Sequence, residues 1–198
     1  MPFIHEHDLL FVHIPKTGGT SIEKKFHLEH SYSNCYRHDE LLFPAKNTMF
    51  SPQHYTPDII KDLYENWFNN YKKFTIVRNP YTRSISEYFF RNNVSTFNDD
   101  DFYIWICKFC ITGYLSDHVL PQSDYFIGAE YDYVLKFESL NDDFKNMCVE
   151  LGIDPELGHH NKSAVNCGNC VEKLSQKSIE TINKKYTDDF TTFGYKFK

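Results

Sequence analysis

The chain has 198 residues, 41% of them hydrophobic and 17% aromatic, which is enough apolar material for a single folded domain over residues 1–198. Its net charge of −6 argues against a nucleic acid as the main partner, because nucleic-acid-binding proteins present a basic face to the phosphates. No apolar run could span a bilayer and residues 1–8 lack signal-peptide features, so we expect a cytoplasmic or otherwise soluble intracellular protein with no membrane span.

The first predicted element is a strand over residues 8–14, which passes through a turn of small residues into a helix over 19–29. Glycines in such a turn let the backbone approach a phosphate or sulfate, hydroxyl side chains donate hydrogen bonds, and a lysine adds positive charge. A tight strand-to-helix turn without a ligand favours the same residue types. The candidate anion-binding residues are Pro15, Lys16, Thr17, Gly18, Gly19, Thr20 and Ser21.

A short strand is predicted at about 48–52, followed by a helix over 57–68 and a second apolar, β-branched strand over 72–78. That strand ends at Arg78, whose planar guanidinium is suited to binding phosphate oxygens. Ordinary surface exposure of this arginine is the alternative.

Asn79-Pro80 ends the second strand, and proline suits the first turn of the helix predicted over 80–91. Ser86 lies about two turns along that helix, close enough to share a phosphate with the arginine at the end of the strand.

The C-terminal half predicts helices over 99–112, 139–151 and 172–186, with a strand over 132–137 between the first two. Strands that alternate with helices predict an α/β fold, in which a central parallel sheet is covered by helices on both faces. The small-residue turn and Arg78 both follow strands. They should therefore meet at the carboxyl edge of the sheet, where one nucleotide can contact both.

Four of the six cysteines form two pairs, Cys107/Cys110 and Cys167/Cys170, in which two residues separate the cysteines, as in a zinc half-site. The first pair lies in a predicted buried helix, where cysteines are usually packing residues. Turn residues separate the second pair, which leaves a disulfide or a metal site as alternatives. We expect packing cysteines and no bound metal.

Four segments resemble the PAPS-dependent sulfotransferases, which use 3′-phosphoadenosine 5′-phosphosulfate (PAPS) as sulfate donor. Residues 15–21 resemble their 5′-phosphosulfate loop, and residues 77–88 resemble their 3′-phosphate motif. Residues 134–153 and the ending Tyr-x-x-Asp-Phe-x-x-Phe-Gly-Tyr at 186–195 resemble the C-terminal half of the family. The pattern is most similar to carbohydrate sulfotransferases of the heparan 2-O- and chondroitin type. The resemblance implies the family's P-loop-like three-layer sandwich.

The resemblance also implies roles for individual residues. Arg78 and Ser86 would hold the 3′-phosphate of PAPS, whereas Lys162 and Ser163 would cover the adenosine. His54 occupies the position of the family's histidine base, although Gln53 replaces the small residue that usually precedes it; His38 is the alternative base.

These roles imply a reaction. The base would take the proton of an acceptor hydroxyl, which we expect on a glycan, and Lys16 would stabilise the leaving phosphate without a metal ion. Two other functions stay open: a kinase-type phosphotransferase, and a catalytically silent module that binds a nucleotide or glycan.

Overall fold

The computed structural model describes residues 3–28, 52–112, 116–158 and 169–198. Its strands are β1 (Phe3–Ile4), β2 (Leu9–Val12), β3 (Lys72–Val77) and β4 (Tyr133–Lys136). Its helices are α1 (Thr20–Lys25), α3 (Pro57–Asn70), α4 (Pro80–Asn92), α5 (Asp99–Thr112), α6 (Ser116–Val119), α7 (Leu140–Leu151), α8 (Gln176–Lys185) and α9 (Thr187–Phe193). Short 3₁₀ turns include Pro52–His54, Gln122–Phe126 and Cys170–Lys173.

The sheet has the strand order β1-β2-β3-β4. Strands β2, β3 and β4 are parallel, as predicted, with Val12 paired to Thr75 and Val77 paired to Lys136. The predicted central parallel sheet is confirmed, and it has in addition an edge strand that the sequence did not predict, β1, which pairs with β2 in the antiparallel sense. This strand is only two residues long, too short to produce a recognisable alternation of apolar and polar residues.

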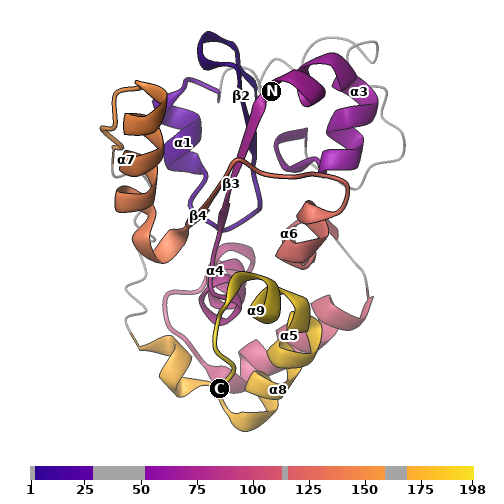
Figure 1. The fold of residues 1–198 in the computed structure, drawn as a ribbon. Coiled ribbons are helices and arrows are strands. Elements are labelled where there is room, and N and C mark those ends of the chain that lie inside the picture. The colour runs from indigo at the N-terminus through magenta and orange to yellow at the C-terminus, as the bar shows by residue number, and fades with distance from the viewer. Residues whose placement is uncertain (1–2, 29–51, 113–115, 159–168) are drawn as a thin grey trace.

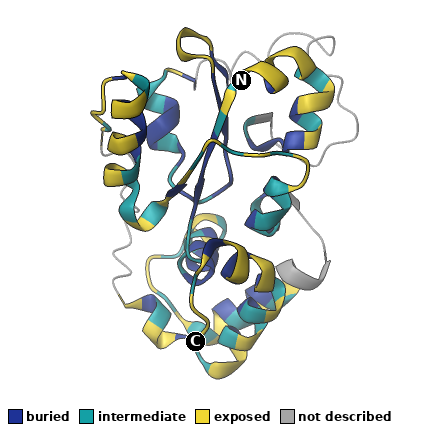
Figure 2. Cartoon of the chain, viewed as in Figure 1, coloured by how far each residue is buried: buried dark blue, intermediate teal, exposed yellow. Residues whose placement is uncertain are grey.

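Helices cover both faces of the sheet, as the sequence predicts for an α/β fold. Figure 1 shows α1 and α7 on one face and α3 on the other. The side chains of β2 alternate accordingly: Leu9 and Phe11 join the core beneath α1 and α7, whereas Leu10 and Val12 join the core that α3 covers. All four residues of β2 and the last four residues of β3 are buried, and these two strands form the dark-blue centre of Figure 2.

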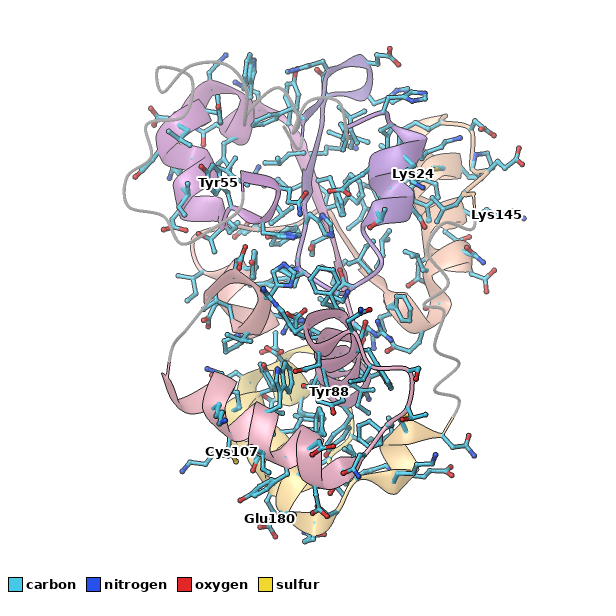
Figure 3. The ribbon with its side chains drawn as sticks, turned by 180° about the vertical axis from the view of Figure 1, so that it is seen from behind. Lys24, Tyr55, Tyr88, Cys107, Lys145 and Glu180 are labelled. Carbon is cyan, nitrogen blue, oxygen red and sulfur yellow. The ribbon has the colours of Figure 1, made fainter. Side chains whose placement is uncertain are left out.

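A third core lies beyond the carboxyl ends of the strands, where α4, α5, α8 and α9 gather (Figure 1). Tyr88 of α4, labelled in Figure 3, packs edge-on against Phe102 and Trp105 of α5. Asn79 begins α4 by accepting a hydrogen bond from the backbone N–H of Tyr81, as a capping residue does.

Two other predicted elements differ from the structure. Of the strand expected at about 48–52, residues 48–51 lie outside the described residues, and Pro52 begins a 3₁₀ turn. The terminal helix expected over 172–186 is α8, which begins later, at Gln176, after the 3₁₀ turn Cys170–Lys173; the sequence did not predict α9, which follows it. Ser175 caps α8, and the backbone of Tyr186 (φ −117°, ψ 29°) interrupts the helix before α9.

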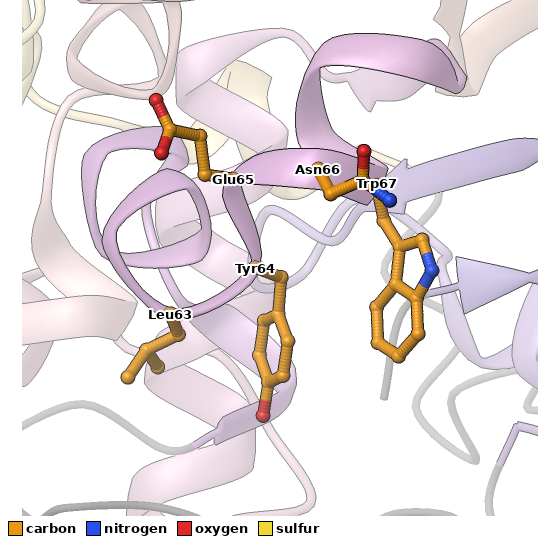
Figure 4. Close-up of a pocket in the computed structure, with 5 residues that line it drawn as sticks. All are labelled: Leu63, Tyr64, Glu65, Asn66 and Trp67. Carbon is orange, nitrogen blue, oxygen red and sulfur yellow. The ribbon is translucent and has the colours of Figure 1, made fainter.

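A shallow pocket of about 330 Å³ opens where α3 is kinked at Tyr64 (Figure 4). It is lined by Leu63, Tyr64, Glu65, Asn66 and Trp67. Since α3 leads directly into the first residue of β3, this pocket lies near the amino end of that strand, away from the edge at which parallel sheets bind ligands. No helix in the described part of the chain is long and apolar enough to cross a membrane.

Candidate functional site

The loop between β2 and α1 turns tightly at the carboxyl edge of the sheet. Lys16 and Gly18 have left-handed backbone conformations, with φ of 66° and 93°. Thr17 is buried, and its hydroxyl donates to the carbonyl oxygen of Ile14 at 2.8 Å. Thr17 therefore closes the turn in this structure, whereas the sequence suggested that its hydroxyl faces a ligand. Thr20 and Ser21 begin α1, and the N–H of Ser21 donates to the carbonyl oxygen of Gly18.

Both glycines of the loop lie against aromatic rings. A Cβ atom on Gly18 would approach Phe137 to 2.9 Å, and one on Gly19 would approach the ring of His13 to 2.3 Å. The sequence suggested that glycine is needed here so that the backbone can approach a phosphate. The structure adds a second, independent reason, because a side chain at either position would collide with one of these two rings. His13 is itself fixed, since its Nδ1 donates to Oε1 of the buried Glu23 at 2.7 Å.

Arg78 follows β3 and links the two predicted anion-binding motifs. Its Nη1 donates to the carbonyl oxygen of Lys16, and its Nε donates to the hydroxyl of Thr82, both at 3.0 Å. Its guanidinium lies 3.9 Å from the centre of the Phe137 ring. Burial, with help from the nearby Arg83 charge, lowers the pKa of Arg78 to about 10 against the attraction of Glu138. The group remains a cation at neutral pH.

Ser86 lies half-buried on α4. Thr82, Ser86 and Phe90 are spaced four residues apart, so they share one face of that helix. Thr82 contacts Arg78, and the Phe90 ring lies 4.0 Å from the Lys16 ammonium. Ser86 therefore lies along the helix between the residues that contact the two candidate phosphate-binding cations.

The side chain of Arg83, on α4, holds the loop between β2 and α1 in place. This buried arginine donates from Nε to the carbonyl oxygen of Pro15 at 3.0 Å and from Nη1 to that of Leu120 at 2.9 Å. Its Nη2 donates to the carbonyl oxygen of His118 at 3.3 Å. Its place in the segment Arg78-Asn79-Pro80-Tyr81-Thr82-Arg83 is the only signal in the sequence that marks this residue.

Lys16 has a mixed electrostatic environment. Burial lowers the pKa of its ammonium group, the carboxylate of Glu87 opposes that change, and the charges of Arg78 and Arg91 add to it. Among the described side chains, the ammonium therefore lies in a cationic cluster that Glu87 balances only in part, an arrangement that favours the arrival of an anion.

His54 lies in the 3₁₀ turn Pro52–His54, and its ring contacts the residue that follows β2. Its Nδ1 lies 3.0 Å from the carbonyl oxygen of His13, and its Nε2 lies 3.0 Å from the amide nitrogen of Gln53. A carbonyl oxygen only accepts, so Nδ1 carries the proton and Nε2 has the lone pair. Burial is the main cause that lowers the pKa of His54 well below its usual value, and the nearby His13 and His118 act in the same direction. The imidazole is therefore neutral near pH 7.

Sequence reasoning missed His118, which lies on the four-residue α6. Its ring centre lies 5.1 Å from that of His54, and its Nδ1 lies 2.8 Å from Oε2 of Glu87. Nothing in the local sequence marks this histidine, because its partners come from α4 and from the turn before α3.

Gln122 and Tyr125 hold the site in place from the 3₁₀ turn Gln122–Phe126. The Gln122 amide bonds both backbone groups of Arg78, at 2.8 Å each. Tyr125 is fully buried, and its hydroxyl donates to the carbonyl oxygen of His54. Tyr125 therefore packs in the core and holds the turn that carries His54.

Three candidate residues, His38, Lys162 and Ser163, lie outside the described residues. Cys107 and Cys148 have free thiols, whereas Cys170 is disulfide-bonded, so the expectation of an ordinary packing thiol is wrong for Cys170. Cys35 and Cys167 lie outside the described residues. Among the side chains that the structure describes, no group of three or more His, Cys, Asp or Glu is arranged to hold a metal ion.

Comparison with known proteins agrees with this geometry. The model of the sulfotransferase family matches residues 3–196, which is nearly the whole chain. No individual curated protein matches the sequence.

Proposed function

The chain belongs to the sulfotransferase family and is a PAPS-dependent sulfotransferase; from this premise we propose that its acceptor is a carbohydrate hydroxyl and that His54 removes the hydroxyl proton. The observation that carries the assignment of His54 as the base is the hydrogen bond from His54 Nδ1 to the carbonyl oxygen of His13. This hydrogen bond holds a neutral imidazole, with its lone pair on Nε2, next to His13, which precedes the loop between β2 and α1.

The residues present fit the donor. PAPS supplies an activated sulfuryl group at one end and a 3′-phosphate at the other. Backbone N–H groups of residues 16–20 and the Lys16 ammonium would bind the phosphosulfate, because they combine a tight turn with a positive charge. Arg78 and Ser86 would bind the 3′-phosphate, because the arginine is fixed at the end of β3 and the serine lies on the neighbouring face of α4.

His54 is neutral and oriented at neutral pH, so its free nitrogen is able to accept a proton. A lowered pKa keeps the ring neutral, and the bond to His13 fixes its tautomer and orientation. The amide of Gln53 now donates to Nε2, the place that an acceptor hydroxyl would take. An acceptor therefore has to displace Gln53 before His54 can remove its proton.

Lys16 would act on the leaving side. As the attacking oxygen bonds to sulfur, the bond between sulfur and the phosphate oxygen breaks and negative charge grows on that oxygen. A fixed ammonium group close to the loop stabilises this charge more in the transition state than in the bound substrate. Positioning and preorganised charge then supply most of the catalysis, without a step assigned to a metal ion.

The proposed acceptor class rests on resemblance in motif to carbohydrate sulfotransferases, with a histidine between the two donor-binding motifs. The test is transfer of radiolabelled sulfate from PAPS to a panel of chondroitin, heparosan and short neutral oligosaccharides. A tyrosine peptide and a simple alcohol complete the panel. Labelling of the peptide or the alcohol alone would overturn the carbohydrate assignment.

The donor site is tested separately by calorimetric titration with adenosine 3′,5′-bisphosphate, 5′-AMP and ATP with magnesium. The bisphosphate should bind at least about tenfold more tightly than 5′-AMP, a difference of about 1.4 kcal/mol. A preference for ATP with magnesium would contradict the assigned 3′-phosphate site and favour phosphoryl transfer. Binding of the bisphosphate with no sulfate transfer to any acceptor, in the wild type and in His54→Ala alike, would indicate a silent binding module.

A further inference from the structure

His118 is a partly buried imidazole that the proposed mechanism leaves without a role. Its Nδ1 lies 2.8 Å from Oε2 of Glu87, whose other oxygen accepts from Nε of Arg91 at 2.7 Å. Glu87 is only 2% exposed, and two elements of the fold hold this pair in place. They are α6, which carries His118, and α4, which carries both Glu87 and the Arg83 side chain that binds the His118 backbone.

The pairing determines the chemistry of the ring. Burial alone would raise the pKa of the Glu87 carboxyl, but hydrogen bonds from His118 and Arg91 outweigh it and leave the pKa lowered. Glu87 is therefore a carboxylate, which only accepts hydrogen bonds, and Nδ1 of His118 donates to it. This leaves Nε2 of His118 to take up a proton, and the carboxylate stabilises the cation that results.

His118 is adjacent to His54 and is connected to Lys16 through the Phe90 ring, which both side chains contact. Its ring meets that of His54 edge to face, with centres 5.1 Å apart and planes at 87°. It stacks on Phe90 at 5.6 Å, and the Lys16 ammonium lies 4.0 Å from the centre of the same Phe90 ring. The two imidazoles are therefore direct neighbours in the fold.

The proposed reaction creates a need for such a group. Sulfuryl transfer forms a bond from the acceptor oxygen to sulfur, breaks the bond from sulfur to the phosphate, and releases the hydroxyl proton to His54. His54 is 3% exposed and has to lose that proton before the next turnover. The side chain of His118 is 14% exposed and lies next to it.

We propose that His118, oriented by Glu87, carries the proton from His54 to solvent. The inference rests on the proposed function, because it takes His54 as the first proton acceptor. The proton passes from Nε2 of His54 through water to Nε2 of His118, where the Glu87 carboxylate balances the new positive charge. A buffer base then removes it, which returns both rings to the neutral state and leaves the electron count of every group unchanged.

The test uses His118→Asn in the full chain, because the asparagine amide can still donate to Glu87. We measure kcat at saturating PAPS and acceptor in weakly buffered solution, then with increasing imidazole. The variant should lose about tenfold or more of kcat, as expected for loss of a proton-transfer group, and added imidazole should restore it. The dissociation constant of adenosine 3′,5′-bisphosphate should stay within about twofold of that of the wild type, a difference of less than 0.5 kcal/mol.

His5→Asn is the matched control. His5 also holds a hydrogen bond through Nδ1, to the Tyr71 hydroxyl, but it lies exposed at the amino end of the sheet. Its kcat should not depend on imidazole more than that of the wild type. Glu87→Gln provides a second variant and should show a smaller loss of kcat that imidazole also relieves.

Each outcome separates the two proposals. If His118→Asn keeps the wild-type kcat in weak buffer, or loses activity that imidazole does not restore, the relay is wrong and the proposed function stands. If the wild-type protein transfers no sulfate from PAPS to any acceptor, the proposed function fails first. Restoration by imidazole in His118→Asn and not in His5→Asn supports the relay.

Discussion

At the scale of single residues, we expect substitution of Lys16 to lower mainly the catalytic rate and substitution of Arg78 to weaken mainly the binding of the donor nucleotide. Lys16→Ala removes the charge beside the leaving phosphate, so kcat should fall by about 100-fold or more, while the binding of adenosine 3′,5′-bisphosphate weakens by a much smaller factor. Arg78→Ala removes the fork at the end of β3, so the bisphosphate should bind at least about tenfold more weakly. Steady-state kinetics and calorimetry measure the two effects.

Lys24→Ala is the control for both variants, since Lys24 lies on α1 away from the loop, as Figure 3 shows. Thermal melting establishes that each variant is folded, which matters because Arg78 also binds the carbonyl oxygen of Lys16. Equal losses of kcat and of binding in the two variants would contradict these roles.

Gln53 is the residue that should limit access to His54. Its amide donates to Nε2 of His54 at 3.0 Å, and a hydrogen bond of this kind contributes about 0.5–1.5 kcal/mol. Gln53→Ala should therefore raise kcat/KM for the acceptor by about 2- to 10-fold, with unchanged binding of the bisphosphate.

Gln176→Ala tests whether loss of any amide has this effect, because Gln176 binds Glu180 on the surface of α8. A fall in kcat/KM for Gln53→Ala would mean that the amide orients the imidazole rather than blocking it.

At the scale of secondary-structure elements, the sequence predicts an element correctly where the residues that define it are neighbours in the chain. The apolar run of β3 with charge only at its ends, and proline at the start of α4, predict both elements and place Arg78 between them. The predicted end of the terminal helix at residue 186 agrees with α8, which ends at Lys185, whereas α9 was not predicted, because its seven residues are too few to show a helical repeat of apolar positions.

The candidate site shows the same division. The loop after β2 and Arg78 were predictable because each motif is continuous in sequence. The anchoring role of Arg83 was not, since its bond to Pro15 joins residues 68 positions apart. His118 was missed for the same reason: its partner Glu87 lies 31 positions away, on another helix.

Arg83 predicts a further effect at this scale, because it ties α4 to the loop before α1. Arg83→Lys keeps the charge but loses the planar arrangement of three donors, so the protein should lose about 2–3 kcal/mol of unfolding free energy. Urea denaturation measures this, and bisphosphate binding should weaken with it. Arg91→Lys, at a more exposed arginine with a carboxylate partner, should cost less. Equal stability losses in the two variants would contradict the anchoring role.

At the scale of the whole molecule, polar bonds connect the sheet with the helices beyond its carboxyl edge. The three hydrophobic cores are separate clusters, two beneath the helices on the faces of the sheet and one around α4, α5 and α8. Arg78, Arg83 and Gln122 reach from one side to the other. The site lies at this junction, so the hydrogen bonds that hold the parts together also position the groups that bind and react.

His54 links this junction to the stability of the whole protein. Its pKa is lowered in the folded state, mainly by burial, whereas the unfolded chain has the usual value of 6.5. As the pH falls below about 6.5, the unfolded state takes up a proton that the folded state does not, so the protein loses up to about 1.4 kcal/mol of unfolding free energy per pH unit. His54→Gln removes this term, and its stability should fall less steeply with decreasing pH.

Urea denaturation at a series of pH values from about 5 to 8 measures both slopes, and the exposed His7→Gln should follow the wild-type curve. The sign is decisive. If His54 were charged in the folded protein, the unfolded state would bind no extra proton, and His54→Gln would not flatten the curve. The same result would remove the neutral imidazole on which the proposed base depends, so this equilibrium measurement tests the mechanism without any acceptor.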